Sequence, residues 1–93
     1  MSANNTYNGW TNYATWRVNL EIFDGMNLED FHTNNLDAYS FGEELHSYAE
    51  EIVLNDCANS LAESYARAFM SDVNWVEIAS SMIETYKDEV SNA

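Results

Sequence analysis

Residues 7–23 read YNGWTNYATWRVNLEIF and contain two of the three tryptophans of this 93-residue chain. The Tyr7–Gly9 segment predicts a turn, because glycine adopts positive φ angles without steric cost and asparagine tolerates them. Thr11 or Asn12 can then cap a helix by accepting a bond from a backbone N–H group. The stretch therefore predicts a helix over residues 12–23, which the following Asp-Gly pair ends.

Large apolar side chains recur within this helix at spacings of three, four and three residues, which places them on one face. They are Tyr13, Trp16, Leu20 and Phe23. An exposed row of this kind would be a binding surface, but a chain this short needs large side chains to fill its interior. We therefore interpret the face as core, with Trp10 folded back onto it as a hydrophobic staple and Trp75 packed against it.

Three longer helices follow from capping signals and helical spacing. The segment Ser40–Glu43 has the form of a capping box and starts a helix that ends at Asn55–Asp56. A second helix is expected over residues 58–70. The last helix starts at an Asn74 cap and ends near Val90.

Each of these helices is expected to turn one apolar stripe toward the core. The stripes comprise Phe41, Leu45, Tyr48, Ala49 and Ile52 in the first, Leu61, Tyr65, Ala68 and Phe69 in the second, and Trp75, Ile78, Ala79, Met82 and Tyr86 in the third. Glu77 is the expected capping-box partner in the last helix. A short helix is also expected after an Asn27 cap, ending at Asn34–Asn35.

The composition favours helices, since the chain has no proline and only three glycines. We predict an all-α fold: a small compact bundle of about four to five helices in a single domain, residues 1–93, with residues 1–9 a mobile lead-in. Short connections predict antiparallel neighbours. The core is small, so a homodimer would add stability. No apolar run is long enough to span a membrane and no signal peptide is evident, so the expected location is the cytoplasm of the host cell.

The candidates for catalysis and metal binding are weak. Cys57 is the only cysteine, so the chain forms no internal disulfide, and one cysteine with two histidines does not complete a structural zinc site. Glu43 and His46 have the E-x-x-H spacing of di-iron bundles, but such a site needs two copies of that motif. We expect no metal, no cofactor and no enzymatic activity.

The net charge is the most unusual property of the composition. Three basic residues stand against sixteen acidic ones, which gives a charge of −13. Charge of this sign opposes direct binding to nucleic acid or to an anionic membrane, and it favours a cationic partner. Each basic residue has an acid within one helical turn, in the pairs Arg17–Glu21, Arg67–Glu63 and Lys87–Glu84. Thirteen carboxylates then lack a local counter-charge.

Several of these carboxylates recur every two helical turns, a separation of about 10 Å on one helix face. The pairs are Glu43 with Glu50 and Glu44 with Glu51, and Glu77, Glu84 and Asp88 form a similar strip. Rows of this kind can imitate the charge of a nucleic-acid backbone. The candidate partner-binding surface comprises Glu43, Glu44, Glu50, Glu51, Asp72, Glu77, Glu84 and Asp88.

Two blocks also carry a family resemblance. YNGWTNYATW at residues 7–16 and DVNWVEIA at residues 72–79, preceded by SLAE at residues 60–63, resemble a family of small proteins encoded by phages, prophages and plasmids. Its members look like NGWTNYETW followed by a helical middle and a closing VNWxEIA. Ala14 stands where an acidic residue is common. The family is a domain of unknown function, so the resemblance implies a mobile-element origin and a small helical fold, without a reaction or catalytic residues.

Two functional hypotheses follow. In the first, the protein is an anti-defence inhibitor of the anti-CRISPR or anti-restriction type, whose carboxylates mimic nucleic acid and block a basic groove of a host nucleoprotein complex. In the second, it is a structural or regulatory phage accessory protein whose acidity serves only solubility. Reversing several surface charges at once distinguishes them, because only the first hypothesis needs the carboxylates for activity.

Overall fold

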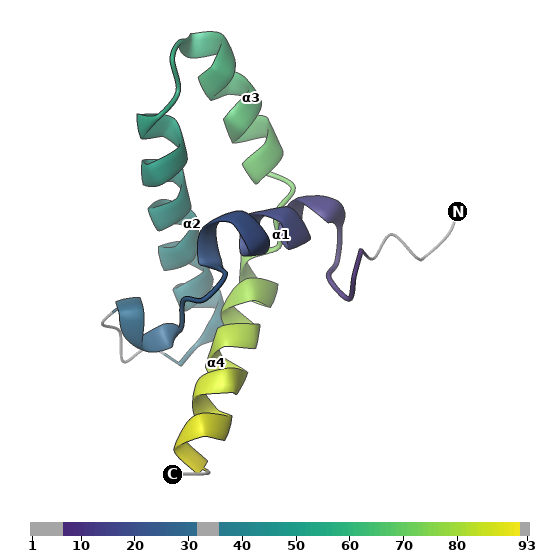
Figure 1. Cartoon of the computed structure of the whole chain (residues 1–93), viewed down its shortest axis with the longest axis vertical. Helices are drawn as coiled ribbons and strands as arrows, with labels where there is room; N and C mark the ends of the chain where they lie inside the picture. The colour runs from purple at the N-terminus through teal and green to yellow at the C-terminus, as the bar shows by residue number, and fades with distance from the viewer. Residues whose placement is uncertain (1–6, 32–35, 92–93) are drawn as a thin grey trace.

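The computed structural model describes residues 7–31 and 36–91, and this part of the chain is all-α, as predicted (Figure 1). The helical elements, in chain order, are α1 (Tyr13–Val18), the π-helical turn η1 (Asn19–Phe23), the 3₁₀ turn η2 (Leu28–Phe31), α2 (Ala38–Asn55), α3 (Ser60–Met70) and α4 (Trp75–Ser91). Residues 1–6 of the expected lead-in and the expected break at Asn34–Asn35 lie outside the described residues. None of the described helices is both long and apolar enough to cross a membrane.

The helices α2 and α4 form the main packed pair, and α1 crosses them near the point where α4 begins (Figure 1). α2 is antiparallel to both α3 and α4, which follow one another in the same direction. The expectation that all sequence neighbours are antiparallel is therefore wrong for α3 and α4, because the Ser71–Asn74 connection lets the chain continue past α2 instead of reversing it.

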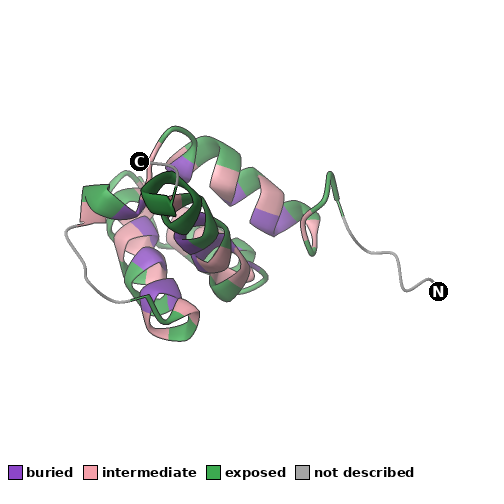
Figure 2. Ribbon diagram, turned by 90° about the horizontal axis from the view of Figure 1, so that it is seen from below, coloured by how far each residue is buried: buried purple, intermediate pink, exposed green. Residues whose placement is uncertain are grey.

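The core lies where α1, α2 and α4 meet, and the buried residues form stripes along the facing sides of these helices (Figure 2). Phe41, Leu45 and Ala49 of α2 are buried, as are Ile78, Ala79 and Met82 of α4, so the main parts of these two predicted stripes are confirmed. Tyr48, Trp75 and Tyr86 are half-buried and pack against the core. Ile83 completes the α4 stripe, whereas Ile52 near the end of α2 is exposed.

The predicted inward face of the first helix is confirmed only in part, since Phe23 is buried and Trp16 is half-buried. Tyr13 and Leu20 are exposed, and the buried residues of α1 are Ala14, Thr15 and Val18. The π-helical turn η1 follows α1, and its i→i+5 hydrogen bonds take in more residues per turn than an α-helix. The five-residue step from Val18 to Phe23 keeps Phe23 on the buried side as predicted, where its ring lies 6.5 Å from that of Trp75.

The N-terminal turn at Tyr7–Gly9 is confirmed. Tyr7 and Trp10 exchange two backbone hydrogen bonds, of 2.7 and 2.8 Å, and both residues between them have positive φ angles. Trp10 is half-buried, packs against the core and lies beside Glu77 and Ser80 of α4. Trp10 thus packs against the core as predicted and also borders α4.

Two predicted caps are also wrong. Ser40 does not cap α2, which begins two residues earlier at an Asp37 cap; the Ser40 N–H and hydroxyl donate to Asp37 Oδ2 at 3.0 and 2.8 Å. Aspartate at this position also faces the positive end of the helix dipole. Asn27 does not cap η2, since its side-chain oxygen accepts no hydrogen bond from the described residues, and the Asp30 carboxylate instead accepts from the Asn27 N–H.

The Asp37 cap predicts a pH dependence of stability. Hydrogen bonds from the Ser40 hydroxyl and N–H lower the pKa of Asp37 below its ordinary value of 3.8. The ionised cap therefore stabilises the fold above that value, and this contribution is lost as the pH falls through the lowered pKa. We expect Asp37→Ala to melt below the wild type at pH 7, with the difference in Tm narrowing below pH 3.8.

Thermal melts by circular dichroism from pH 2.5 to 7 measure this difference. Acid relieves the repulsion within the −13 chain in both proteins, so that effect largely cancels in the comparison. Asp37→Asn is the control, because the amide oxygen still accepts the capping bonds and does not titrate. A constant gap between wild type and Asp37→Ala across the whole pH range would contradict the prediction.

The predicted inward face of α3 is wrong as well. Leu61, Tyr65 and Phe69 are all exposed, as is Ala68, and Met70 is the only buried residue of this helix. The physical reason is the divergence of α3 from α2: α4 occupies the first half of α2, and α3 touches the rest of the protein only along one edge.

Candidate functional site

The two tryptophan-containing blocks of the sequence meet where α1 and α4 begin. Asn12 caps α1 by accepting the Thr15 N–H at 2.8 Å, and its Nδ2 donates to the Asp72 carbonyl at 2.8 Å. The Thr15 hydroxyl donates to Asn12 Oδ1 at 2.7 Å and accepts the Asn74 N–H at 2.8 Å. Each helix start thus helps to satisfy polar groups of the other, which fixes α1 against α4.

Glu77 is held by the same junction. Its Oε1 accepts the Thr11 N–H at 3.0 Å, and its own N–H donates to Asn74 Oδ1 at 3.1 Å. The Asn74 cap is therefore confirmed. The expected capping-box role of Glu77 is wrong, because the Asn74 N–H is already bonded to Thr15 and the Glu77 carboxylate reaches across to Thr11.

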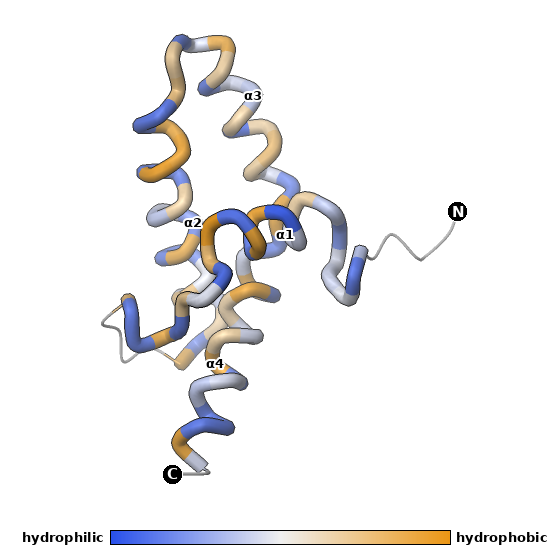
Figure 3. Tube along the Cα trace, in the orientation of Figure 1, coloured by the Kyte–Doolittle hydropathy of each residue, from blue (hydrophilic) through white to orange (hydrophobic). Residues whose placement is uncertain are grey.

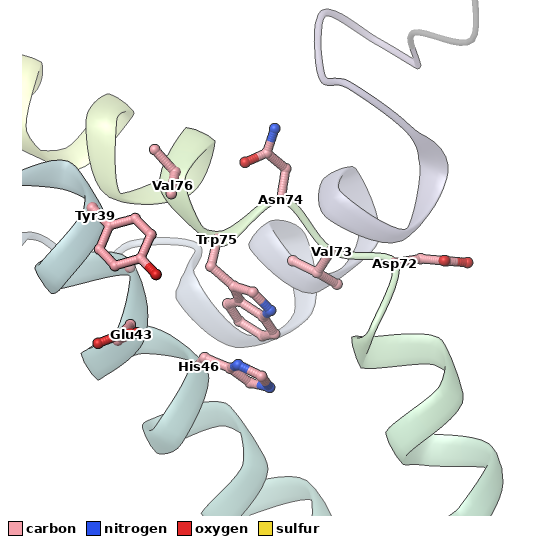
Figure 4. A pocket seen from close by; sticks show the side chains of 9 residues that line it. Tyr39, Glu43, His46, Asp72, Val73, Asn74, Trp75 and Val76 are labelled. Atoms are coloured by element: carbon pink, nitrogen blue, oxygen red, sulfur yellow. The ribbon is translucent and has the colours of Figure 1, made fainter.

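A pocket of about 420 Å³ lies between the first half of α2 and the start of α4 (Figure 4). The imidazole of His46 stacks on the indole of Trp75, with ring centroids 4.5 Å apart and ring planes 10° from parallel. The lining residues are Tyr39, Gly42, Glu43, His46, Asp72, Val73, Asn74, Trp75 and Val76. Of the predicted site residues, the fold brings Glu43 and Asp72 to this pocket.

Acidic and aromatic side chains border the pocket. Glu43 lies beside Tyr39 at one side of the pocket, and Asp72 lies at the opposite side with its carboxylate turned away from Trp75 (Figure 4). Carboxylates and aromatic faces are the groups that bind guanidinium and ammonium ions. The sequence did not indicate Tyr39 or Trp75 as site residues. Trp75 could have been recognised from its position directly after the Asn74 cap. A residue in the first turn of a helix has helix neighbours on one side only, so part of its side chain stays accessible.

The other predicted acidic residues of α2 lie outside the pocket. Glu44 and Glu51 are exposed on the outer side of the helix. Glu50 is partly covered: His46 Nε2 lies 3.3 Å from its Oε2, and Arg67 Nη1 of α3 lies 3.7 Å from the same atom. The α2 row thus divides into an open part and a part whose charge is compensated by α3.

The acidic strip of α4 lies on another face. Glu77 and Glu84 line a groove together with Trp10 and Ser81, and Asp88 is exposed one turn after Glu84. The eight predicted residues are therefore distributed over the outer side of α2, the pocket and the outer side of α4. The fold separates these groups because α2 and α4 turn their apolar stripes toward the core and their acidic strips away from it.

Two of the three expected local ion pairs form. Arg17 Nη2 lies 2.6 Å from Glu21 Oε2, and Arg67 Nη2 lies 3.0 Å from Glu63 Oε2. The Tyr13 hydroxyl and the Glu21 carboxylate both raise the pKa of Arg17. Within residues 7–31 and 36–91, Lys87 has no ion pair within 4.0 Å. Both arginines are thus paired with carboxylates of neighbouring helical turns.

The described residues contain no group of three or more His, Cys, Asp or Glu side chains that could hold a metal ion. Glu43 and His46 line the same pocket, but His46 turns to Trp75 and Glu50. Cys57 is half-buried at the end of α2, where its Sγ donates to the Val53 carbonyl at 3.4 Å.

A second hollow, of about 480 Å³, lies between α1, the end of α2 and α3. Its lining is almost entirely apolar and includes Val18, Val53, Ala66 and Met70. From the sequence we predicted that α3 buries its apolar stripe here, because the side chains of that stripe recur at the spacing typical of a buried helix face.

Comparison with protein-family models, with curated proteins and with solved structures found no match to this chain.

Proposed function

We propose that the protein is an acidic inhibitor that occupies a basic, nucleic-acid-binding groove of a host defence complex, of the CRISPR or restriction type. The observation that carries this proposal is the placement of exposed carboxylates on the outer sides of α2 and α4, the two helices that form the packed centre of the fold. α2 and α4 together carry eight of the sixteen acidic residues of the chain.

The spacing of the carboxylates fits such a groove. Residues two helical turns apart, such as Glu44 and Glu51 or Glu77 and Glu84, are separated by about 10 Å along the helix. This lies between the widths of the two grooves of B-DNA, about 6 and 12 Å, across which phosphates face each other. Lysines and arginines arranged to neutralise phosphates can bind carboxylates at similar separations.

The rigidity of the scaffold favours binding. Phe41, Leu45 and Ile78 have no exposed surface, so α2 and α4 are held together by a closely packed core. A preorganised row of charges loses less conformational entropy on binding than a flexible acidic tail would lose. The resemblance of the Trp10 and Trp75 blocks to a phage and plasmid family supplies the biological setting in which an inhibitor of host defence is useful.

The test compares two triple variants that remove the same number of charges. Glu43→Gln, Glu51→Gln and Glu84→Gln lie on the proposed surface, whereas the control variant neutralises Asp24, Glu29 and Asp56, which are also exposed. Each protein is immobilised and incubated with bacterial lysate at 50 and 500 mM NaCl, with and without added duplex DNA. Bound proteins are identified and quantified by mass spectrometry.

We expect wild type and the control to recover nucleic-acid-binding proteins at low salt, and high salt or DNA to release them, because the contacts are electrostatic. The surface variant is expected to recover at least tenfold less of these nucleic-acid-binding proteins at low salt than the wild type does. An accessory protein whose acidity serves only solubility would give the same recovery with all three baits. If both variants lost the same amount of bound protein, the net charge would determine binding, and the position of the carboxylates on α2 and α4 would not.

A further inference from the structure

The stripe of α3 that the sequence assigned to the core forms an exposed apolar surface. Leu61 is 61% exposed, Tyr65 70% and Phe69 37%, and they follow one another at intervals of four residues on one side of the helix. Tyr13 of α1 is 42% exposed and extends this surface, with its ring 6.4 Å from that of Phe69. We call these four residues, together with the adjacent apolar hollow, the α3 face.

The four exposed side chains form a ridge, and the hollow lies directly beside it. Val18, Ile22, Val53 and Met70 line it, and Tyr65 and Phe69 form one of its walls. Figure 3 shows hydrophobic segments along α3 and at the end of α2 that faces it. Apolar patches of this extent on a soluble protein mark interaction surfaces. The charge and the shape of the α3 face indicate what covers it.

The charge around the α3 face is nearly balanced, in contrast to the rest of the molecule, with two arginines against three glutamates. Arg17 pairs with Glu21 at one edge, and Arg67 pairs with Glu63 and lies near Glu50 at the other. These two arginines are two of the three basic residues of the chain. A strongly basic partner would gain little here. A second copy of this chain carries the same −13, and it meets the least repulsion at this face.

The size of the surface also fits a second copy. From the exposed fractions, the four residues of the ridge present on the order of 500 Å² of side chain, since large aromatic side chains bury about 150–250 Å² each. A standard interface buries about 800 Å² on each partner. The ridge would therefore supply the apolar centre of such an interface, and the paired arginines and glutamates its polar rim.

We infer that the α3 face joins two copies of the chain in a two-fold dimer. A two-fold interface uses the same patch on both subunits, so the patch must fit itself. The α3 face meets this condition because Leu61 and Tyr65 of its ridge project next to a hollow whose lining is apolar as well. In the dimer, the Tyr65 ring of each copy packs into the hollow of the other, and the acidic outer sides of α2 and α4 remain open.

Analytical ultracentrifugation of the full chain tests the inference. Wild type is examined from 5 μM to 1 mM in 50 and 500 mM NaCl. We expect a monomer–dimer equilibrium whose dimer fraction increases with salt, because salt screens the repulsion between two chains of charge −13. This is the opposite of the salt dependence expected for an inhibitor bound to a basic partner. The inference and the proposed function can therefore fail independently.

The double variant Leu61→Ala and Tyr65→Ala is expected to weaken dimerisation at least 100-fold. Both positions are exposed and alanine is the strongest helix former, so the fold is retained, which circular dichroism verifies. Tyr39→Ala is the matched control, because Tyr39 is 65% exposed on α2 and lies outside the α3 face. A wild type that stays monomeric at 1 mM in 500 mM NaCl would overturn the inference. So would a dimer that the double variant leaves unchanged.

Discussion

Replacing Thr15 by valine is expected to lower the free energy of unfolding by about 2–4 kcal/mol, through the loss of a capping network and an unpaired N–H group. Thr15 has no exposed surface, and its hydroxyl is bonded to Asn12 Oδ1 and to the Asn74 N–H. Valine has nearly the same shape, so it fills the space but offers no acceptor. The variant therefore isolates the hydrogen bonds that join α1 to α4.

Urea unfolding followed by tryptophan fluorescence measures this effect, with an unchanged m-value indicating that only stability has changed. Thr85→Val is the matched control, because Thr85 is exposed on α4 and the substitution again exchanges one β-branched residue for another. The control is expected to stay within about 0.5 kcal/mol of wild type, as surface substitutions usually do. A Thr15→Val protein as stable as the control would refute the structural role assigned to the network.

The second large effect is expected at Gly42, where α2 comes closest to α4. A Cβ atom placed on Gly42 would lie 3.2 Å from the Trp75 carbonyl carbon and oxygen and from the Val76 nitrogen. All three are backbone atoms of the adjacent helix, so no side chain can move aside. We expect Gly42→Val to destabilise the protein by about 1–3 kcal/mol, the usual cost of overpacking in a core, because the slightly better helix propensity of valine over glycine offsets little of it.

Gly42→Ala separates the two terms of this prediction. Its single methyl group meets the tight contact, but alanine in a helix is favoured over glycine by about 1 kcal/mol, so its net effect is expected to be small. Ser47→Val controls for valine in α2, because Ser47 is exposed on the same helix. Equal urea midpoints for Gly42→Val and Gly42→Ala would mean that α4 yields to the larger side chain. Displacement of α4 would also disturb the His46–Trp75 stack, which near-ultraviolet circular dichroism reports.

Both substitutions bear on the proposed function, because the α2–α4 pair carries the exposed carboxylates. A destabilised variant that still folds at 10 °C is expected to bind partners normally there and to lose binding as it unfolds on warming. The charge-neutralised triple variant is expected to lose binding at every temperature, which separates a failure of the scaffold from a failure of the surface.

Local signals in the sequence predicted the parts of the fold that depend on local physics. Asn12 and Asn74 cap helices as expected, because a cap is formed by side chain and backbone within one turn. The buried stripes of α2 and α4 follow from 3.6-residue spacing, and these helices do pack on each other through them. The ion pairs of Arg17 and Arg67 are i, i+4 neighbours and form as the spacing predicts.

The candidate surface was predictable only in its composition. That Glu77 and Glu84 share a side of α4 follows from helical geometry, and their common groove agrees with it. That Glu43 and Asp72 line one pocket does not follow from the sequence, because Glu43 lies on α2 and Asp72 in the connection between α3 and α4. The ion pair between Arg67 of α3 and Glu50 of α2, at 3.7 Å, does not follow from the sequence either.

The sequence by itself determined the helical class of the protein, the starts of α1 and α4, the apolar stripes of the central pair and the −13 charge. Only the tertiary structure decided which amphipathic stripes are buried: α1 buries Ala14 and Val18 and leaves Tyr13 exposed, and the divergence of α3 leaves Leu61 and Tyr65 exposed. The physical reason is that helical periodicity fixes which side chains share a face, whereas burial depends on whether another element arrives to cover that face.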